Sequence, residues 1–158
     1  MRTSYVIAIG SNKRHPRYGA PAQIVAAVIE ALMPLARSRI ISSRPIGPSQ
    51  RRYANAAILI ESALMPPVLL LKLKSIEHNF GRRTSGQRWS ARVLDLDIIL
   101  WSGGIWADKT LTIPHPDYRV RSFVLGPLCD VAPKWRDPVT RFSALQLKAC
   151  LDRKRPRP

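Results

Sequence analysis

The chain has few cysteines and no long apolar run. Its two cysteines, Cys129 and Cys150, lack the spacing of a metal site and lie in no secretory context, so we expect neither a disulfide framework nor an oxidising compartment. No stretch approaches the roughly 20 apolar residues that a membrane span requires, and the N-terminus lacks the apolar core of a signal peptide. These absences predict a cytoplasmic protein that does not associate with membranes.

Several common catalytic motifs are also missing. The sequence contains no Walker A motif, no G-x-G-x-x-G, no H-E-x-x-H and no G-x-S-x-G. Any nucleotide site is therefore expected to be neither a P-loop nor a Rossmann crevice.

Acidic residues are scarce relative to basic ones. The chain has 26 Lys and Arg but only 10 Asp and Glu, a formal net charge of +16. This balance predicts affinity for anions, which include nucleic acid, an acidic membrane surface and a polyphosphate substrate. With 46% hydrophobic residues the chain is expected to fold as one domain, residues 1–147. A basic, disordered tail, residues 148–158, is expected to follow, either inert or acting as a polyanion-binding arm.

The hydrophobic pattern predicts an alternation of strands and helices. Pro21 suits the first turn of a helix that Pro34 ends, and Pro66 opens a second helix. We expect an α+β fold with the ferredoxin-like split βαβ plan, in which helices pack on one face of a mainly antiparallel sheet. The expected strands are residues 5–9, 39–43, 53–61 and 93–101, with a hairpin at Gly103-Gly104 leading into a partner strand around 105–113. The expected helices are residues 21–33, 66–78 and a segment from 122 to about 129.

Asp95 and Asp97 interrupt an otherwise apolar strand. Because strand side chains alternate between faces, both carboxylates are expected on one face. The residues expected on the other face are Leu94, Leu96, Ile98 and Leu100. Two neighbouring carboxylates repel each other and need cations. The pattern alone fits salt bridges to nearby arginines, and it also fits Mg²⁺ held with substrate phosphates.

A basic segment precedes this strand, and a Pro-rich turn follows it. The first contains Arg82, Arg92 and Trp89, and arginine forks match phosphate oxygens, although a solvated basic loop fits the composition as well. The second contains His115, followed by Arg121. These two side chains are candidates for the same phosphates, with a purely structural histidine as the alternative.

Together these motifs resemble the 6-hydroxymethyl-7,8-dihydropterin pyrophosphokinases of folate biosynthesis. The resemblance covers about residues 6 to 138, and its most specific part is the R-W-x-x-R-x-L-D-L-D run that starts at Arg88. It also includes Ala8-Ile9-Gly10-Ser11-Asn12, Tyr53-Ala54-Asn55 and Ile113-Pro114-His115-Pro116.

The resemblance implies transfer of diphosphate from MgATP to the hydroxymethyl group of the pterin, with release of AMP. It implies that Asp95 and Asp97 hold two Mg²⁺ ions. The catalytic residues that it implies, which grip the triphosphate, are Arg82, Arg92, His115 and Arg121. The further ATP-binding residues are Lys74, Glu77, Ile98, Leu111 and Thr112. The pterin-binding residues are Pro45, Ile46, Tyr53, Asn55, Trp89 and Phe123.

The chain departs from the family at two places. The loop after Ser43 is short and lacks an aromatic-x-Thr-x-Pro segment, so Pro45 and Ile46 are expected to replace part of the pterin wall. Lys74 stands where the family often has an amide. Two other functions fit the sequence: a relative with low turnover, and a basic ferredoxin-like module that binds nucleic acid. We expect a monomer that acts on small molecules and binds neither nucleic acid nor membrane.

Overall fold

The main sheet is antiparallel and is built around a central N-terminal strand. The computed structural model describes residues 1–45, 51–81 and 93–154. Strand β1 (Thr3–Ser11) lies between β4 (Tyr53–Ser62) and β5 (Asp95–Trp101), and the short β2 (Ala36–Arg37) pairs with the far edge of β4. Strand β3 (Ile41–Ser43) also pairs with β4. The α+β class and the antiparallel sheet are confirmed.

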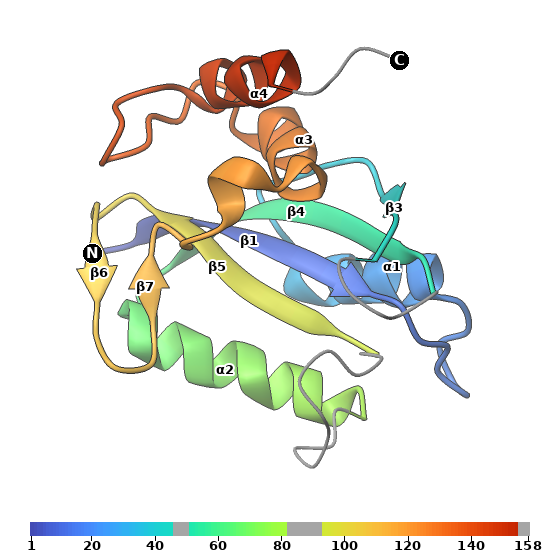
Figure 1. The fold of residues 1–158 in the computed structure, drawn as a ribbon. Coiled ribbons are helices and arrows are strands. Elements are labelled where there is room, and N and C mark those ends of the chain that lie inside the picture. Colours follow the sequence, from blue (N-terminus) through green and yellow to red (C-terminus); the bar gives the residue numbers. More distant parts are fainter. Residues whose placement is uncertain (46–50, 82–92, 155–158) are drawn as a thin grey trace.

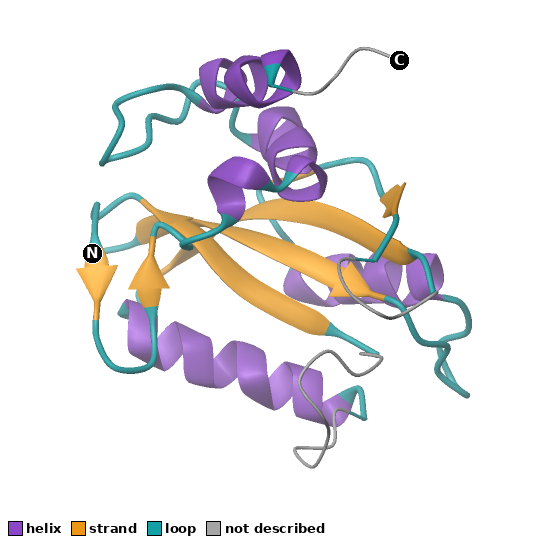
Figure 2. Ribbon diagram, viewed as in Figure 1, coloured by secondary structure: helices purple, strands orange, loops and turns teal. Residues whose placement is uncertain are grey.

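The helices cover both faces of this sheet (Figures 1 and 2). Helices α1 (Pro21–Leu32) and α2 (Pro66–Asn79) lie on one face, as expected. Helix α3 (Ser122–Val131) covers part of the other face, preceded by the 3-10 turn η1 (Tyr118–Val120), and α4 (Ala144–Arg153) packs on α3. None of the helices in the described part of the chain is long and apolar enough to cross a membrane.

Side-chain alternation along the strands divides the core into two layers. Tyr5, Ile7 and Ile9 of β1 pack with α1 and α2, whereas Val6 packs with α3 residues such as Leu125. The polar side chains Asn55, Asp95 and Asp97 of the sheet lie on the α3 face, whereas Ile98 packs in the opposite layer.

A bulge in β5 corrects one sequence prediction. Val6 pairs with Leu100 but Ile7 pairs with Ile98, so Ile99 is the additional residue. Leu100 therefore joins Ile99 in the layer under α3, and the expectation that it shares a face with Ile98 was wrong. Strict alternation cannot pass through a bulge.

The segment after β5 also differs from the prediction. Gly103-Gly104 does form a turn, but only an isolated bridge joins Trp101 to Gly104. Instead β6 (Trp106–Ala107) and β7 (Thr112–Ile113) pair with each other as a separate two-stranded sheet. The Asp108 carboxylate organises their connection, because it accepts hydrogen bonds from the N–H groups of Thr110 and Leu111.

The C-terminal region is more ordered than its composition predicts. Residues 148–153 belong to helix α4, so the expectation of a disordered tail from residue 148 was wrong for them; residues 155–158 lie outside the described part. The helix starts with a capping box in which the Ser143 hydroxyl accepts from the Gln146 N–H, and the Gln146 side chain accepts from the Ser143 N–H. These bonds satisfy N–H groups that a helix start otherwise leaves unpaired.

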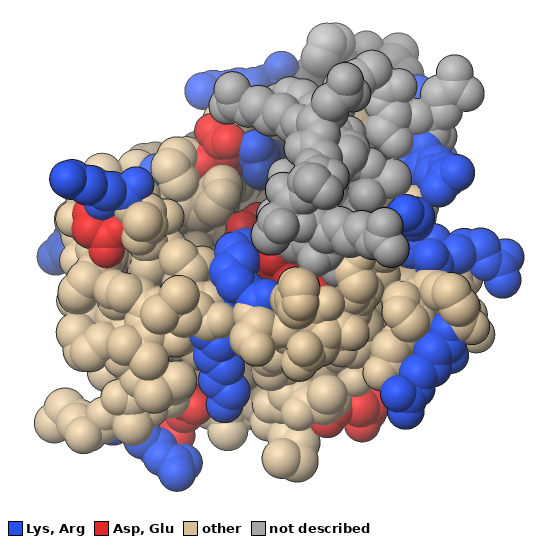
Figure 3. All heavy atoms as spheres, turned by 90° about the horizontal axis from the view of Figure 1, so that it is seen from below, with Lys and Arg blue, Asp and Glu red and all other residues tan. Residues whose placement is uncertain are grey.

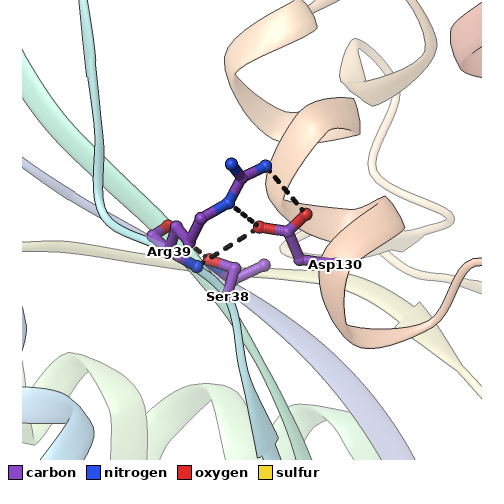
Figure 4. A network of polar contacts seen from close by, with 4 residues as sticks. Ser38, Arg39 and Asp130 are labelled. Carbon is purple, nitrogen blue, oxygen red and sulfur yellow. Dashed lines mark hydrogen bonds and ion pairs between the residues drawn. The ribbon is translucent and has the colours of Figure 1, made fainter.

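A polar network connects α3 to the segment between β2 and β3 (Figure 4). Asp130 of α3 accepts hydrogen bonds from the backbone N–H and the guanidinium of Arg39. The adjacent Ser38 hydroxyl accepts from the Ala57 N–H of β4 at 2.9 Å. The network therefore fixes the approach to β3 between the sheet and α3, which are two walls of the site described next.

Candidate functional site

A cavity of about 370 Å³ opens on the α3 side of the sheet. Its floor is β1, where Gly10 pairs with Asn55 on one side and with Asp95 on the other. Gly10 has no side chain, and Ala8 has a small one, so the floor stays open. The other lining residues are Ile9, Ser43, Arg44, Tyr53, Ala56, Asp97, Ile99, His115, Asp117, Arg121, Phe123 and Val124.

One end of this cavity combines aromatic rings with an amide. Tyr53 and Asn55 come from β4 and Phe123 from the first turn of α3. Asn55 is 6% exposed, and its Nδ2 donates to the Ser43 hydroxyl at 2.8 Å. Flat rings suit a flat heteroaromatic ligand, and the amide suits its polar edge.

The other end carries the two carboxylates. Asp95 and Asp97 both line the cavity, whereas Leu96 and Ile98 pack in the opposite layer, so the predicted shared face is confirmed. Burial raises the pKa of the Asp97 carboxyl, and the charge of Asp95 raises it further, while His115 and Lys74 oppose the shift. A bound cation would offset the repulsion between the two carboxylates and the cost of burying their charge. Oxygen donors of this type suit Mg²⁺.

Hydrogen-bond donors on one side of the cavity come from His115 and Arg121. The Arg121 guanidinium donates to Asp117 at 2.6 Å, and the Asp117 N–H donates to His115 Nδ1 at 3.2 Å. With Nδ1 accepting, the neutral imidazole carries its hydrogen on Nε2. Asp117 therefore orients both groups. Its role was missed in the sequence, where only its position between the two was a signal.

A second cavity, also of about 370 Å³, lies between α2, β5 and the β6–β7 connection. Lys74, Ile98, Leu111 and Thr112, all predicted nucleotide residues, line it. Hydrogen bonds from Trp106 and Thr110 hold the pKa of Asp108 below its usual range. The ionised carboxylate thus keeps these bonds, which order the β6–β7 connection at one side of the cavity. The remaining lining residues are Leu70, Asp97, Lys109, Thr110, His115 and Pro116.

Glu77, a predicted nucleotide residue, is next to the second cavity through its partner Lys74. Its side chain is fully buried and lines neither cavity. Its carboxylate accepts from Lys74 Nζ at 2.9 Å and from the Leu96 N–H at 2.7 Å. Glu77 thus holds Lys74 against β5, and it contributes to the site through Lys74.

The two cavities meet at Asp97 and His115, which line both. Of the predicted pterin residues, Pro45 is described but does not line the first cavity, where Ser43 and Arg44 lie instead. The predictions for Ile46, Arg82, Trp89 and Arg92 fall outside the described residues.

Across the surface seen from the side of α2, Lys and Arg side chains are spread around the rim (Figure 3). The acidic side chains on this face form small separate patches, and one near its middle lies directly against basic side chains.

The protein thus has an antiparallel α+β fold with two adjoining chambers and with acidic and basic groups at their junction. A family model described as 7,8-dihydro-6-hydroxymethylpterin-pyrophosphokinase matches residues 6–133. The chain belongs to this family.

Named relatives agree with the assignment. The chain is similar to the 2-amino-4-hydroxy-6-hydroxymethyldihydropteridine pyrophosphokinase of Haemophilus influenzae, with 38% identity over 84% of this chain and 82% of that one. The protein of the same name from Pseudomonas aeruginosa is 35% identical over 91% of this chain and 90% of its own length. A third, from Synechocystis, is 42% identical over 66% of this chain, and the match spans 53% of the Synechocystis protein.

Solved structures show the same fold at low identity. A Plasmodium falciparum HPPK-DHPS chain superposes with a TM-score of 0.73 at 12% identity, covering 95% of this chain and 45% of the other. An HPPK-DHPS chain in complex with substrates gives 0.74 at 11% identity, covering 94% and 44%. The chain thus spans less than half the length of these solved relatives.

Proposed function

We propose that this protein transfers diphosphate from MgATP to the hydroxymethyl group of 6-hydroxymethyl-7,8-dihydropterin and releases AMP. The observation that carries the proposal is the junction of the two cavities at Asp97 and His115. A nucleotide in the second cavity and a pterin in the first would bring their reacting groups together at this wall. Such an arrangement converts a bimolecular reaction into one between held partners.

We propose one direction for the pterin in the first cavity. Asn55 and Asp95 flank Gly10 on neighbouring strands, so they are two strand spacings, about 9 to 10 Å, apart. A two-ring heteroaromatic with its amino edge at Asn55 would extend its hydroxymethyl group towards the carboxylates. Tyr53 and Phe123 supply the aromatic surfaces for the ring.

We assign metal binding to the carboxylates and phosphate binding to the hydrogen-bond donors. Asp95 and Asp97 would hold two Mg²⁺ ions together with phosphate oxygens, and the metal would neutralise charge on the transferred group. His115 and Arg121 would bind phosphate oxygens, since Nε2–H and the guanidinium both donate. Lys74 would add positive charge on the nucleotide side. We assign Arg82, Arg92 and Trp89 the phosphate-binding and ring-covering roles that the family resemblance implies.

We also propose that the fold follows the ferredoxin-like plan and that the chain acts as a cytoplasmic monomer. The strand order β2-β4-β1-β5 supports the first point. The expectation of a cytoplasmic monomer rests on the sequence alone.

The direct test is product analysis with the hydroxymethyl dihydropterin, ATP and Mg²⁺. Phosphorus NMR is expected to show AMP and a pterin diphosphate in equal amounts, and a chelator should stop both. ADP as the nucleotide product, or no pterin-dependent turnover, would contradict the proposal. Binding of both substrates with very slow AMP formation would instead identify a low-turnover relative.

A further inference from the structure

Lys74 and Glu77 form an ion pair that is attached to strand β5 beside the cavity carboxylates. Lys74 lines the second cavity together with Asp97, and its ammonium group donates to Glu77 Oε1 at 2.9 Å. The same carboxylate oxygen accepts from the N–H of Leu96 at 2.7 Å, and Leu96 directly precedes Asp97 in β5. The ammonium group therefore lies within two hydrogen-bond lengths of the β5 backbone next to Asp97.

The two members of this pair differ in their surroundings. The Glu77 side chain is fully buried, whereas the Lys74 side chain is 40% exposed. A buried carboxylate with these two hydrogen bonds is fixed in place, and it fixes the lysine ammonium group with it. Asp97 interacts electrostatically with both charges, and the effect of Lys74 is the larger of the two. The charge of Lys74 thus acts on the cavity carboxylates although its hydrogen bond goes to Glu77.

We propose that this ion pair sets the affinity of the two cavity carboxylates for divalent metal ions: Lys74 lowers it and Glu77 raises it. This inference rests on the proposed function and adds two residues that control its metal ions. A fixed ammonium group repels a metal ion that approaches the carboxylates, and a fixed carboxylate attracts it. Because Lys74 stands where the family often has an uncharged amide, the nucleotide-free protein should hold metal weakly. Phosphate oxygens of the nucleotide then supply negative charge for both the metal and Lys74.

The helix that carries the pair also offers a matched control. Lys72 lies on α2, two residues before Lys74, and is exposed. It lines neither cavity. Lys72→Gln therefore removes the same formal charge from the same helix, but outside the cavities. Lys74→Arg is a second control, because it keeps the positive charge at position 74.

The test measures the Kd of Mn²⁺ by electron paramagnetic resonance, without nucleotide or pterin and at one fixed ionic strength. Asp97→Asn identifies the site, because it should remove the Mn²⁺ binding in question. Lys74→Gln is expected to bind Mn²⁺ roughly 3- to 10-fold more tightly, the effect of losing one nearby unit charge. Glu77→Gln is expected to bind it about 2- to 5-fold more weakly. Lys72→Gln and Lys74→Arg should match the unaltered protein.

Opposite signs in the two variants distinguish an effect of charge from an effect of structure. A purely structural role would weaken Mn²⁺ binding in both, so weaker binding in Lys74→Gln would overturn the inference. An unchanged Kd in either variant would also overturn it. An equal gain in Lys72→Gln would do the same, because it would show an effect of net charge alone.

The Asp97→Asn variant separates this inference from the proposed function. If that variant loses the Mn²⁺ site and only the changes expected at Lys74 and Glu77 fail, the proposed function stands without this inference. If Mn²⁺ binding is independent of Asp97 both with and without a non-hydrolysable ATP analogue, the metal assignment and this inference fall together.

Discussion

At Asp97, stability of the fold favours a neutral carboxyl group, whereas the proposed metal binding requires a charged carboxylate. Its carboxyl has a raised pKa because burial and Asp95 disfavour its charge. The folded state thus binds this proton more tightly than the unfolded state does. The resulting stability is fully present below the unfolded pKa of about 3.9 and is lost as pH rises through the folded pKa.

The first prediction follows from this sign. Without metal at pH 7, Asp97→Asn should be at least as stable as the unaltered protein, and its advantage should vanish below about pH 4. AMP formation should be lost. Urea unfolding with chelator at both pH values, together with a turnover assay, checks this. A large loss of stability at pH 7 would mean that the carboxylate serves the fold.

Arg44 is the cavity residue whose position the sequence did not reveal. It lines the first cavity next to Ser43, at the wall for which Pro45 and Ile46 were expected. A planar guanidinium can cover a heteroaromatic ring, which the ammonium group of lysine does poorly.

The second prediction concerns this wall. Arg44→Ala should weaken pterin binding by about tenfold or less, the effect of losing one stacked contact of about 1 kcal/mol. Arg44→Lys should restore little of it, and the Kd of the ATP analogue should not change. Full rescue by lysine in the calorimetric titration would show that charge rather than stacking matters.

At the scale of single residues, the positions of the two carboxylates were easier to predict than those of the residues that form the cavity walls. Two carboxylates in an apolar strand are costly unless cations balance their charge, so the sequence marked Asp95 and Asp97 as candidates and predicted the face that they share. The place of Arg44 depends on how the short loop turns after β3, and no local pattern encodes this. The sequence did not predict that the Glu77 carboxylate accepts from Lys74 and from the Leu96 N–H, because these contacts arise from the packing of α2 against β5.

At the scale of elements, the three central strands form a floor whose openness depends on β1. The third prediction is that Gly10→Ala folds normally but loses pterin affinity. The added methyl group would meet Asn55 Oδ1 at 3.6 Å and Tyr53 Cδ1 at 3.9 Å, ordinary contacts that the fold tolerates. Alanine also lowers the entropy of the unfolded chain, worth about 0.5 to 1 kcal/mol. The methyl group would occupy space needed by the ring, and overpacking of about 1 to 3 kcal/mol would reduce affinity tenfold or more.

Gly126→Ala is the control for this substitution. A Cβ there, on α3, meets nothing within 4 Å, so this variant should gain stability and keep its pterin affinity. Melting temperatures and pterin titrations of both variants decide the matter. Equal pterin affinity in Gly10→Ala would place the ring away from β1.

The long elements were predictable because their hydrophobic period is clear over many residues. The failures share a physical cause, which is that tertiary contacts decide short elements. Strands β6 and β7 need only two residues each because Asp108 organises the turn between them. The bulge at Ile99 changes the face to which the following residue points, and no sequence pattern indicates it. Helix α4 was missed since its charged residues suggested a solvated tail, while its Ser143 capping box indicated a helix start.

At the scale of the whole molecule, one ion pair joins the segments before and after α3. Arg119 of η1 donates to Asp137, with one contact at 2.9 Å, and Asp137 also accepts from the Val139 N–H. Burial opposes ionisation of Asp137, but the hydrogen bonds from Arg119 and Val139 hold its pKa below the usual range. Its stabilising contribution is therefore present above the unfolded pKa of about 3.9 and is lost progressively as pH falls from there through the lower folded pKa.

The fourth prediction is that Asp137→Asn lowers the free energy of unfolding by about 3 kcal/mol at pH 7. We take the lower end of the range for a broken buried pair because the Arg119 side chain is 25% exposed. The difference from the unaltered protein should shrink as the pH falls towards 3. Denaturant unfolding at pH 7 and pH 3 measures it, and a difference independent of pH would show that packing, not charge, causes the loss.

The wall shared by the two cavities has a thermodynamic consequence. Because Asp97 and His115 line both chambers, a ligand that orders or neutralises them in one chamber changes the free energy of binding in the other. Linkage requires this coupling to be reciprocal: the factor by which the nucleotide analogue tightens pterin binding must equal the factor by which pterin tightens nucleotide binding. Four titrations close this cycle, and a factor of one in both directions would show that the two chambers bind their ligands independently. Through the wall that the two cavities share, each proposed substrate would thus change the affinity for the other.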